Sequence, residues 1–578
     1  MIVRQPFAAV TGSALALALG ACAASETGGP ESSAAAPDFV ARCAALQGRT
    51  DDMFGTVESA ALGPAEFTGQ QFFLPTPIAL PRHCEIIGAF PSRDGAQGQK
   101  YAIRYHLRLP EGWNGRFLFQ GGGGLNGVLG DAMGWTGAGQ QPGIVQGYAV
   151  VSQDSGHDKQ ANSDPDWGGE AVFGSDPEAR RNYGNGALPV VADAAKTLIR
   201  AFYGSDARYS YFFGCSKGGQ EGMAFAQRYP DTFDGIVAIA PGMSLPRAAV
   251  AQTWDVQSFA RLWDPAKGAL TPASFATLFS PSDFDLVRQA VGAACDGLDG
   301  ADDGLIGNFM QCTSARVLSE LRKRECGAGN SGACLATDKV DALNRSLEGP
   351  HDAQGKPIYA SWRWDMGIGS PGWAMWKLGN PQMPSLNILT GGASLPTVFM
   401  TPPRAVRGDP QSLLDFQMAF KFPQDADAIY ATAPGWPRSA WQDVGMRSAD
   451  LDGFRKHGGK LIVPHGVSDP VFSINDTIAW RDDVDSRYHG DADSTVRVFP
   501  VPGMNHCGGG PATGRYDAFA ALVNWVEKGN APQAIVATAG ADTPWPGRTR
   551  PLCAYPKMVR YRGAGSIEQA ENFECVDS

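Results

Sequence analysis

Short apolar runs of strand length alternate with helical patterns along much of this chain. Helical periodicity covers residues 189–203 before one of these runs, and residues 514–528 form a closing helical pattern. Such alternation predicts a mostly parallel sheet with helices packed on its faces. The apolar runs are residues 117–119, 147–152, 209–213, 235–240, 459–466 and 494–500. Residues 101–109 instead alternate apolar and polar positions, which predicts an antiparallel strand, and residues 38–76 show no clear pattern.

The strand–helix alternation stops between residues 243 and 446. This stretch is rich in Trp, Pro and Gly and holds four of the 11 cysteines. We expect an insertion that forms a lid domain over the active site. The predicted organisation is therefore a first catalytic part at 38–242, the lid at 243–446 and a second catalytic part at 447–578.

The N-terminus is typical of a targeting segment. Arg4 precedes an apolar stretch at residues 8–21 that is too short to span a bilayer, so residues 1–22 predict a signal peptide. Leu19-Gly20-Ala21-Cys22 resembles a lipobox, in which Cys22 carries a lipid anchor, and residues 23–37 would then be a flexible tether. The alternative is ordinary cleavage nearby. We expect an exported protein, either a periplasmic or outer-membrane lipoprotein or a secreted one.

Composition narrows the classes of partner. Among 578 residues, 43% are hydrophobic and 19% charged, which indicates a globular protein. A net charge of −11 without any basic run argues against nucleic acid. We expect a monomer that acts on a small-molecule substrate and meets a membrane only through an anchor on Cys22. Apart from Cys22 the cysteines number ten, an even set that favours disulfides in an exported chain.

One motif indicates the chemistry. Gly214-Cys215-Ser216-Lys217-Gly218 follows the strand at 209–213 and precedes a helical pattern that runs through Arg228. This is G-x-S-x-G in strand–turn–helix context, the nucleophile elbow of the α/β-hydrolase fold. Glycines two positions before and after the serine leave room for so sharp a turn. We therefore predict an α/β-hydrolase fold with Ser216 as nucleophile.

The partners of Ser216 should follow in the order acid, then His. His506 lies in a loop after the strand at 494–500, where the general base belongs, and Asp469 follows the strand at 459–466. Asp476 and Asp443 remain as weaker candidates for the acid. His465 sits at a strand end before the candidate acid.

Two local features support this assignment. A glycine run at 121–124 follows the strand at 117–119, where backbone N–H groups would form part of an oxyanion hole; a flexible linker is the alternative. Cys215 directly precedes the nucleophile and Cys507 directly follows the base, so a disulfide between them would hold the two loops together.

These motifs together resemble the tannase and feruloyl esterase family. The resemblance rests on Gly-Cys-Ser-Lys-Gly-Gly from residue 214, His-Gly-Val-Ser-Asp from 465 and Pro-Gly-Met-Asn-His-Cys-Gly-Gly-Gly-Pro from 502. It implies catalytic Ser216, Asp469 and His506, with oxyanion N–H groups on Gly124 and Lys217. It also implies five disulfides: Cys43–Cys84, Cys215–Cys507, Cys295–Cys312, Cys326–Cys334 and Cys553–Cys575.

The resemblance further implies a structural Ca²⁺ in the lid. Its ligands would be the carboxylates of Asp296, Asp299 and Asp303 with the backbone carbonyls of Ala301 and Leu305. Clustered carboxylates on a glycine-kinked loop suit a hard cation with six to eight oxygen ligands. A solvated acidic turn is the alternative.

Specificity is where the chain departs from part of the family. Members that hydrolyse terephthalate monoesters hold the substrate carboxylate with an Arg, and Ala393 aligns there; Arg404 and Arg407 lie further along. Phe472 matches an aromatic wall of the acyl site, and Trp373 is a second candidate for substrate binding, although it could simply be lid core. We expect a serine carboxylic ester hydrolase for feruloyl, galloyl or related esters. A terephthalate-monoester hydrolase and an inactive, lipid-anchored binding protein are the alternatives.

Overall fold

The computed structural model describes residues 38–69, 76–327 and 333–577. Residues 39–577, apart from the two internal gaps, belong to one compact unit. The predicted signal peptide, the tether and Cys22 lie outside the described residues. In the part of the chain that is described, no helix has the length and apolarity needed to cross a membrane.

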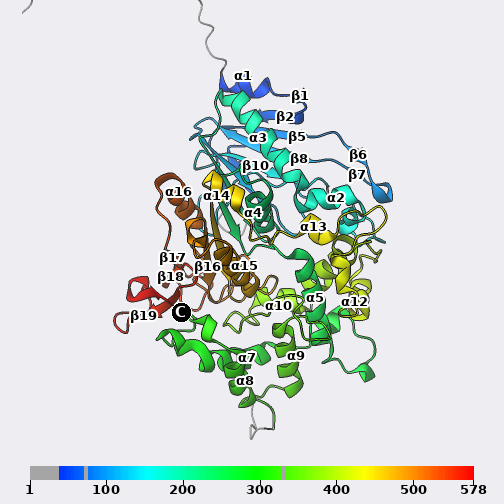
Figure 1. Cartoon of the computed structure of the whole chain (residues 1–578), viewed down its shortest axis with the longest axis vertical. Helices are drawn as coiled ribbons and strands as arrows, with labels where there is room; N and C mark the ends of the chain where they lie inside the picture. The colour runs from blue at the N-terminus through cyan, green and yellow to red at the C-terminus, as the bar shows by residue number, and fades with distance from the viewer. Residues whose placement is uncertain (1–37, 70–75, 328–332, 578) are drawn as a thin grey trace, which may run out of the picture. The chain divides into compact units, whose positions relative to one another are not determined.

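A ten-stranded mixed sheet forms the centre of the fold (Figure 1). Its second half, from β10 to β16, is entirely parallel, whereas the first strands pair antiparallel. In spatial order the strands are β1 (Thr50–Asp51), β2 (Gly55–Leu62), β5 (His83–Ala89), β8 (Arg104–Pro110), β10 (Ala149–Gln153), β9 (Arg116–Gln120), β11 (Tyr209–Cys215), β12 (Gly235–Ile239), β15 (Lys460–Gly466) and β16 (Val496–Val501).

Alternate side chains of the strands supply two separate hydrophobic clusters, because successive residues of a strand point to opposite faces. Phe119 of β9 and Phe212 of β11 pack into one cluster with helices α3 (Ala187–Tyr203) and α4 (Lys217–Arg228). Leu118 and Tyr211, their immediate neighbours, pack into the other cluster with α16 (Ala518–Lys528). The sheet is thus covered on both faces, as its continuous apolar runs require.

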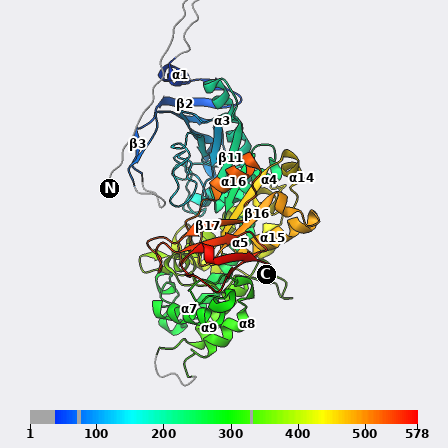
Figure 2. The same cartoon turned by 90° about the vertical axis from the view of Figure 1, so that its left-hand side faces the viewer.

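The segment between β12 and β15 is a largely helical insertion, drawn green to yellow in Figures 1 and 2. Its strands are only β13 (Gly379–Asn380) and β14 (Met383–Pro384) among the residues described there. Its α-helices are α5 (Leu245–Ala260), α6 (Pro272–Phe275), α7 (Pro281–Cys295), α8 (Ser314–Arg322), α9 (Thr337–Glu348), α10 (Pro371–Lys377), α11 (Gly392–Ser394), α12 (Pro410–Ala419) and α13 (Ala440–Val444), and α14 (Asp452–His457) follows just before β15.

The chain after β16 adds α16 and two short hairpins. These are β17 (Ala534–Thr538) with β18 (Thr549–Cys553), and β19 (Met558–Tyr561) with β20 (Phe573–Val576). A further helix, α15 (Ile474–Arg487), lies between β15 and β16.

The predicted strands are present, with ends shifted by a few residues. The unplaced stretch at 38–76 contributes α1 (Phe39–Ala44), the edge strand β1 and its neighbour β2. All five predicted disulfides are present in the structure. A mixed sheet whose parallel half carries the elbow is consistent with an α/β-hydrolase.

Candidate active site

Ser216 occupies a strained turn between β11 and α4. Its backbone has φ 64° and ψ −120°, a conformation that residues with a side chain rarely adopt. A Cβ at Gly214 would lie 2.6 Å from the backbone of Gly218, and one at Gly218 would lie 2.6 Å from the carbonyl oxygen of Gly122. The two glycines of the motif therefore allow the turn itself and the close approach of the glycine-rich loop.

Asp469 and His506 form a buried pair. The carboxylate lies in the loop after β15 and accepts a hydrogen bond of 2.8 Å from Nδ1 of His506, in the loop after β16. Its second oxygen accepts the N–H groups of Val471 and Phe472. Burial alone would raise the pKa of Asp469, but His506 and His465 outweigh it and hold the pKa below its usual value. Asp469 is thus an anion that fixes the orientation of His506.

The opposite nitrogen of His506 is unoccupied. Its Nε2 is buried and forms no hydrogen bond with the residues described. The rings of Phe472 and Trp376 contact the imidazole edge-on, with centroids 5.2 and 5.6 Å away. An imidazole held in this way can accept a proton at Nε2.

The other candidate acids have different partners. Asp476 pairs with Arg447, and Asp443 pairs with Arg180 and Arg438. His465 is fully buried and is held between Thr477 and the carbonyl of Phe472, with its Nε2 3.5 Å from Asp469. The structure therefore joins Asp469, among these three carboxylates, to His506.

A disulfide connects the nucleophile turn to the base loop. Cys215 and Cys507 are bonded, with Cα atoms 6.0 Å apart. Since each cysteine is adjacent in sequence to Ser216 or His506, the bond limits how far these two residues can separate.

A buried ion pair holds the glycine-rich loop against the elbow. Lys217 Nζ lies 3.0 Å from Glu221, and both side chains are inaccessible to solvent. Glu221 also accepts hydrogen bonds from the N–H of Gly122 and from the side-chain amide of Asn126. Burial lowers the pKa of Lys217, while Glu221 favours its charged form. Glu221 was not predicted from the sequence, although its i,i+4 spacing from Lys217 on a helix is a signal for such a pair.

The insertion also contacts the loops that carry Asp469 and His506. Asp365 is fully buried, and one of its oxygens accepts hydrogen bonds from the Ser468 hydroxyl at 2.6 Å and the Gly503 N–H at 2.7 Å. Ser370 donates to Asn505, next to the base, at 2.6 Å. The insertion is therefore part of the framework of the acid and base loops.

Asp365 should make stability depend on pH. Burial raises the pKa of Asp365 to about 6, although bonds from Ser468 and Gly503 oppose the rise. Because this value exceeds that of an unfolded Asp, the native state keeps the proton longer, and the stabilisation present at low pH is lost as pH rises through about 6. Between pH 4 and 7, wild type should lose about 2 kcal/mol of unfolding free energy relative to Asp365→Asn. Urea unfolding at each pH measures this difference; parallel pH curves would contradict it.

A largely apolar cavity begins at Ser216 and extends beneath the insertion. Gly124 and Lys217 line it beside Ser216. Phe472 lines it as predicted from the resemblance, and so does Trp376. Trp373, the predicted substrate residue, is instead buried edge-on against Phe284 and is not part of the lining. The remaining lining residues are Leu125, Tyr183, Leu245, Ala248, Ala249, Gln252, Thr390, Ser394, Phe399 and Val471.

No arginine lines this cavity among the described residues. Ala393 is buried beside it, Arg404 pairs with Asp425, and Arg407 is an exposed partner of Asp166 and Asp409. Lys217 is the cation of the lining, and Glu221 balances its charge. The acyl cavity therefore offers no free positive charge from the described side chains.

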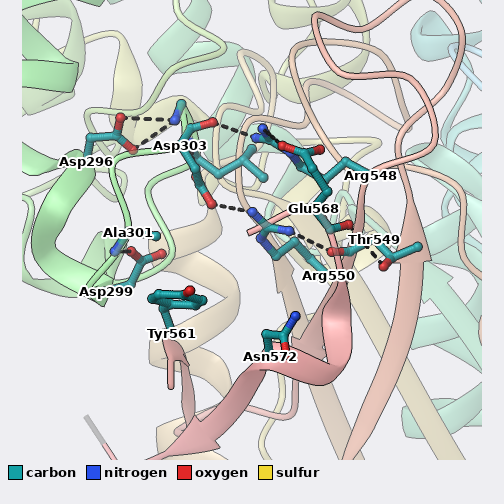
Figure 3. Close-up of polar contacts among 12 residues, drawn as sticks. Asp296, Asp299, Ala301, Asp303, Arg548, Thr549, Arg550, Tyr561, Glu568 and Asn572 are labelled. Carbon is teal, nitrogen blue, oxygen red and sulfur yellow. Dashed lines mark hydrogen bonds and ion pairs between the residues drawn. The ribbon is translucent and has the colours of Figure 1, made fainter. Parts of the chain in front are cut away.

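The acidic loop of the insertion contacts the C-terminal hairpin β17–β18 (Figure 3). Asp303 forms an ion pair with Arg550, and its carbonyl accepts a hydrogen bond from Arg548. Asp296 accepts the Gly304 N–H and Asp299 accepts the Ala301 N–H. In the described residues, no three His, Cys, Asp or Glu side chains are gathered closely enough to hold a metal ion.

The donor chemistry of this loop nevertheless fits a hard cation. Asp299 and Asp303 are buried, and burial together with neighbouring carboxylates raises the pKa of Asp299 to about 7. Of the two arginines beside this loop, Arg550 pairs with Asp303, whereas Arg548 pairs with Glu568. One guanidinium therefore pairs with a loop that carries three carboxylates, Asp296, Asp299 and Asp303, and a bound cation would balance the remaining negative charge.

Comparison with known proteins identifies the family. Residues 84–576 match the family model described as tannase and feruloyl esterase. The chain belongs to the tannase and feruloyl esterase family. It is 37% identical to mono(2-hydroxyethyl) terephthalate hydrolase of Piscinibacter sakaiensis, over 93% of this chain and 92% of that one. It is 30% identical to a probable feruloyl esterase of Arthroderma benhamiae, over 82% and 83% of the two chains. Membership of this family makes the chain a carboxylic ester hydrolase.

Solved structures show the same fold. Feruloyl esterase B from Aspergillus oryzae superposes with a TM-score of 0.73 at 24% identity, covering 93% of this chain and all of that one. Tannin acyl hydrolase from Aspergillus niger gives a TM-score of 0.63 at 20% identity, covering 93% and 94%.

Proposed function

We propose that this protein is a serine hydrolase that cleaves esters of aromatic, phenolic acids such as feruloyl or galloyl esters through an acyl-enzyme. The observation that carries the proposal is the Asp469–His506 pair, tied by the Cys215–Cys507 bond to the turn that presents Ser216. The names of the similar proteins supply the substrate class. The apolar cavity with aromatic walls from Phe472 and Trp376 suits a planar ring.

In the proposed first step, Ser216 Oγ attacks the ester carbonyl carbon while His506 Nε2 takes the hydroxyl proton. The carbonyl oxygen becomes an oxyanion, which the N–H groups of Gly124 and Lys217 stabilise. Lys217 is the first residue of α4, so its N–H has no partner within the helix. When the tetrahedral intermediate collapses, the carbon–oxygen bond to the alcohol breaks and His506 returns the proton to the leaving alcohol.

The second step releases the acid. Water attacks the acyl carbon of Ser216, His506 takes a proton from it, and collapse returns that proton to Ser216 Oγ. Asp469 stabilises the imidazolium in both steps and stays ionised, in agreement with its lowered pKa.

An ester panel tests the substrate class. We expect turnover of methyl ferulate or methyl gallate that Ser216→Ala abolishes. The similarity to the terephthalate hydrolase favours mono(2-hydroxyethyl) terephthalate as the alternative substrate. The lack of a free cation in the described acyl cavity argues against that carboxylate. Faster hydrolysis of the terephthalate monoester than of both phenolic esters would favour the alternative. Failure to hydrolyse any ester, including a p-nitrophenyl ester, would favour the inactive binding protein.

We also propose that Ca²⁺ binds at Asp296, Asp299 and Asp303, with the carbonyls of Ala301 and Leu305. Its role would be structural, since it would offset carboxylate repulsion in a loop that Cys295–Cys312 encloses. The chemistry at the ester would be left to the Ser–His–Asp residues.

Removal of calcium should lower stability and leave the chemical step intact. Chelation should lower Tm by a few degrees and added Ca²⁺ should restore it, because a ligand that binds only the native state stabilises it by about 2.7 kcal/mol at 100 times its Kd. Asp299→Asn should remove the response to Ca²⁺. Differential scanning calorimetry measures both. If neither chelator nor added Ca²⁺ changed the Tm, the calcium proposal would be wrong, and Arg550 alone would balance the negative charge of the loop.

We also propose that the protein is exported from the cytoplasm. Disulfides form and persist in oxidising compartments. The chain has one disulfide next to Ser216 and His506 and one near each end of its described part, which supports export. We propose a monomer, with a lipid anchor on Cys22 or, as the alternative, secretion.

A further inference from the structure

The cavity beside Ser216 is lined by neutral polar groups that have no side-chain hydrogen-bond partner among the described residues. Gln252 lines the cavity and is 6% exposed, yet its side-chain amide makes no hydrogen bond with the described residues. Ser394, which is 2% exposed, and Thr390 line the same cavity, also without side-chain hydrogen bonds to those residues. Buried amides are almost always paired, so an unpaired one facing a cavity points to a ligand.

The position of Gln252 follows from the helix that carries it. Leu245, Ala248, Ala249 and Gln252 form one stripe of α5 along the cavity, at the i, i+3, i+4 and i+7 positions. Gly242, just before this helix, donates its N–H to the Ser216 carbonyl at 3.1 Å and packs closely on Leu245. The first residue of the stripe therefore lies near the nucleophile turn. Gln252 follows it by seven residues, or about 10 Å of helix rise.

A later segment of the insertion packs against the Gln252 side chain. A Cβ at Gly391 would lie 2.5 Å from the Gln252 side-chain oxygen, so this glycine leaves the amide its space. The amide is thus held between α5 and the segment Asn387–Gly391. Its fixed place suits the recognition of one atom of a bound ring.

The chemistry selects a neutral hydroxyl. An amide both donates to and accepts from a phenolic hydroxyl, whereas a carboxylate is best matched by a free cation, and the one cation of the described lining, Lys217, is already paired with Glu221. The two turns between Leu245 and Gln252 favour an acyl group whose ring is separated from the ester carbon. A hydroxycinnamoyl group places its ring hydroxyl two carbons further from that carbon than a galloyl group does.

We propose that Gln252 is a specificity-determining residue that hydrogen-bonds the ring hydroxyl of a hydroxycinnamoyl acyl group. This inference rests on the proposed esterase function and names the acyl group within it. Gln252 would take no part in bond cleavage at Ser216, so its effect should depend on the ring substituent of the ester.

Methyl p-coumarate and methyl cinnamate test the proposal, because they differ by that one hydroxyl. Gln252→Met keeps the side-chain length and removes the amide. The ratio of kcat/KM for coumarate to that for cinnamate should fall about tenfold or more in this variant. Gln417→Met is the matched control, since Gln417 is also buried but donates to the Asn387 carbonyl at 2.9 Å. It should leave the ratio unchanged, whatever it does to Tm.

A ratio unaltered by Gln252→Met would overturn the inference. If that variant does not fold, the unmodified enzyme decides: equal kcat/KM values for the two esters overturn the inference, and a clear preference for coumarate supports it. Absence of turnover of both methyl esters and of a p-nitrophenyl ester by the unmodified enzyme would instead overturn the proposed function, and the inference with it.

Discussion

Ser216→Ala should lower kcat on a phenolic ester by about 10⁴- to 10⁶-fold, with KM little changed, because the variant keeps the cavity but loses the atom that forms the acyl-enzyme. His506→Ala should be comparable, since Nε2 of His506 is the unoccupied proton acceptor of the site. Members of such a triad act as a unit, so the double variant should be hardly worse than either single one.

Pre-steady-state kinetics with excess p-nitrophenyl ester provides the measurement, because the initial burst of p-nitrophenol reports acylation directly. Asp469→Asn should also be severe, since it removes the anion that orients His506. Asp476→Asn is the matched control, because Asp476 pairs with Arg447 and does not contact His506. A larger loss in the control than in Asp469→Asn, or additive losses in the double variant, would refute this assignment of roles.

Glu221→Leu should reduce both stability and turnover. It leaves the Lys217 ammonium buried and unpaired, which costs about 3–5 kcal/mol. It also removes the acceptor that holds the Gly122 N–H and the Asn126 amide. If the glycine-rich loop loses its place beside Ser216, kcat should fall about 10²- to 10³-fold.

A second substitution separates the two effects. In Glu221→Leu/Lys217→Met both buried charges are gone while the backbone N–H of residue 217 remains, so stability should recover. Turnover should stay low, because the loop is still unsupported. Asp443→Asn serves as control: it breaks the equally buried pair with Arg180 away from the loop and should cost stability alone. Recovery of kcat together with Tm in the double variant would show that Glu221 acts only through stability.

Local motifs made the candidate site residues recognisable in the sequence. Ser216 sits in a five-residue pattern with a fixed structural context, and Asp469 and His506 each follow a recognisable buried strand. The cysteines adjacent to Ser216 and His506 gave a further constraint that the structure satisfies. Strand ends shifted because periodicity does not record where the last ladder hydrogen bond lies.

Contacts between distant segments could not be read in the same way. Asp365 meets Ser468 and Gly503 only because the insertion folds back onto the sheet, more than 100 residues along the chain. The sequence also does not tell which side of α10 lines the cavity. Trp373 and Trp376 have similar surroundings in the sequence, yet Trp376 lines the cavity and Trp373 packs on Phe284. Gln252 had no signal, because its lack of a partner is visible only once its neighbours are known.

The Cys215–Cys507 bond has a consequence for the biogenesis of the enzyme. Its two cysteines are 292 residues apart, and the ring that they close contains the whole insertion. During synthesis the turn that carries Ser216 is made long before the loop that carries His506. On the roles proposed for these residues, a nascent chain would stay inactive until nearly the entire polypeptide is made. Formation of this disulfide in an oxidising compartment would then fix the two loops together.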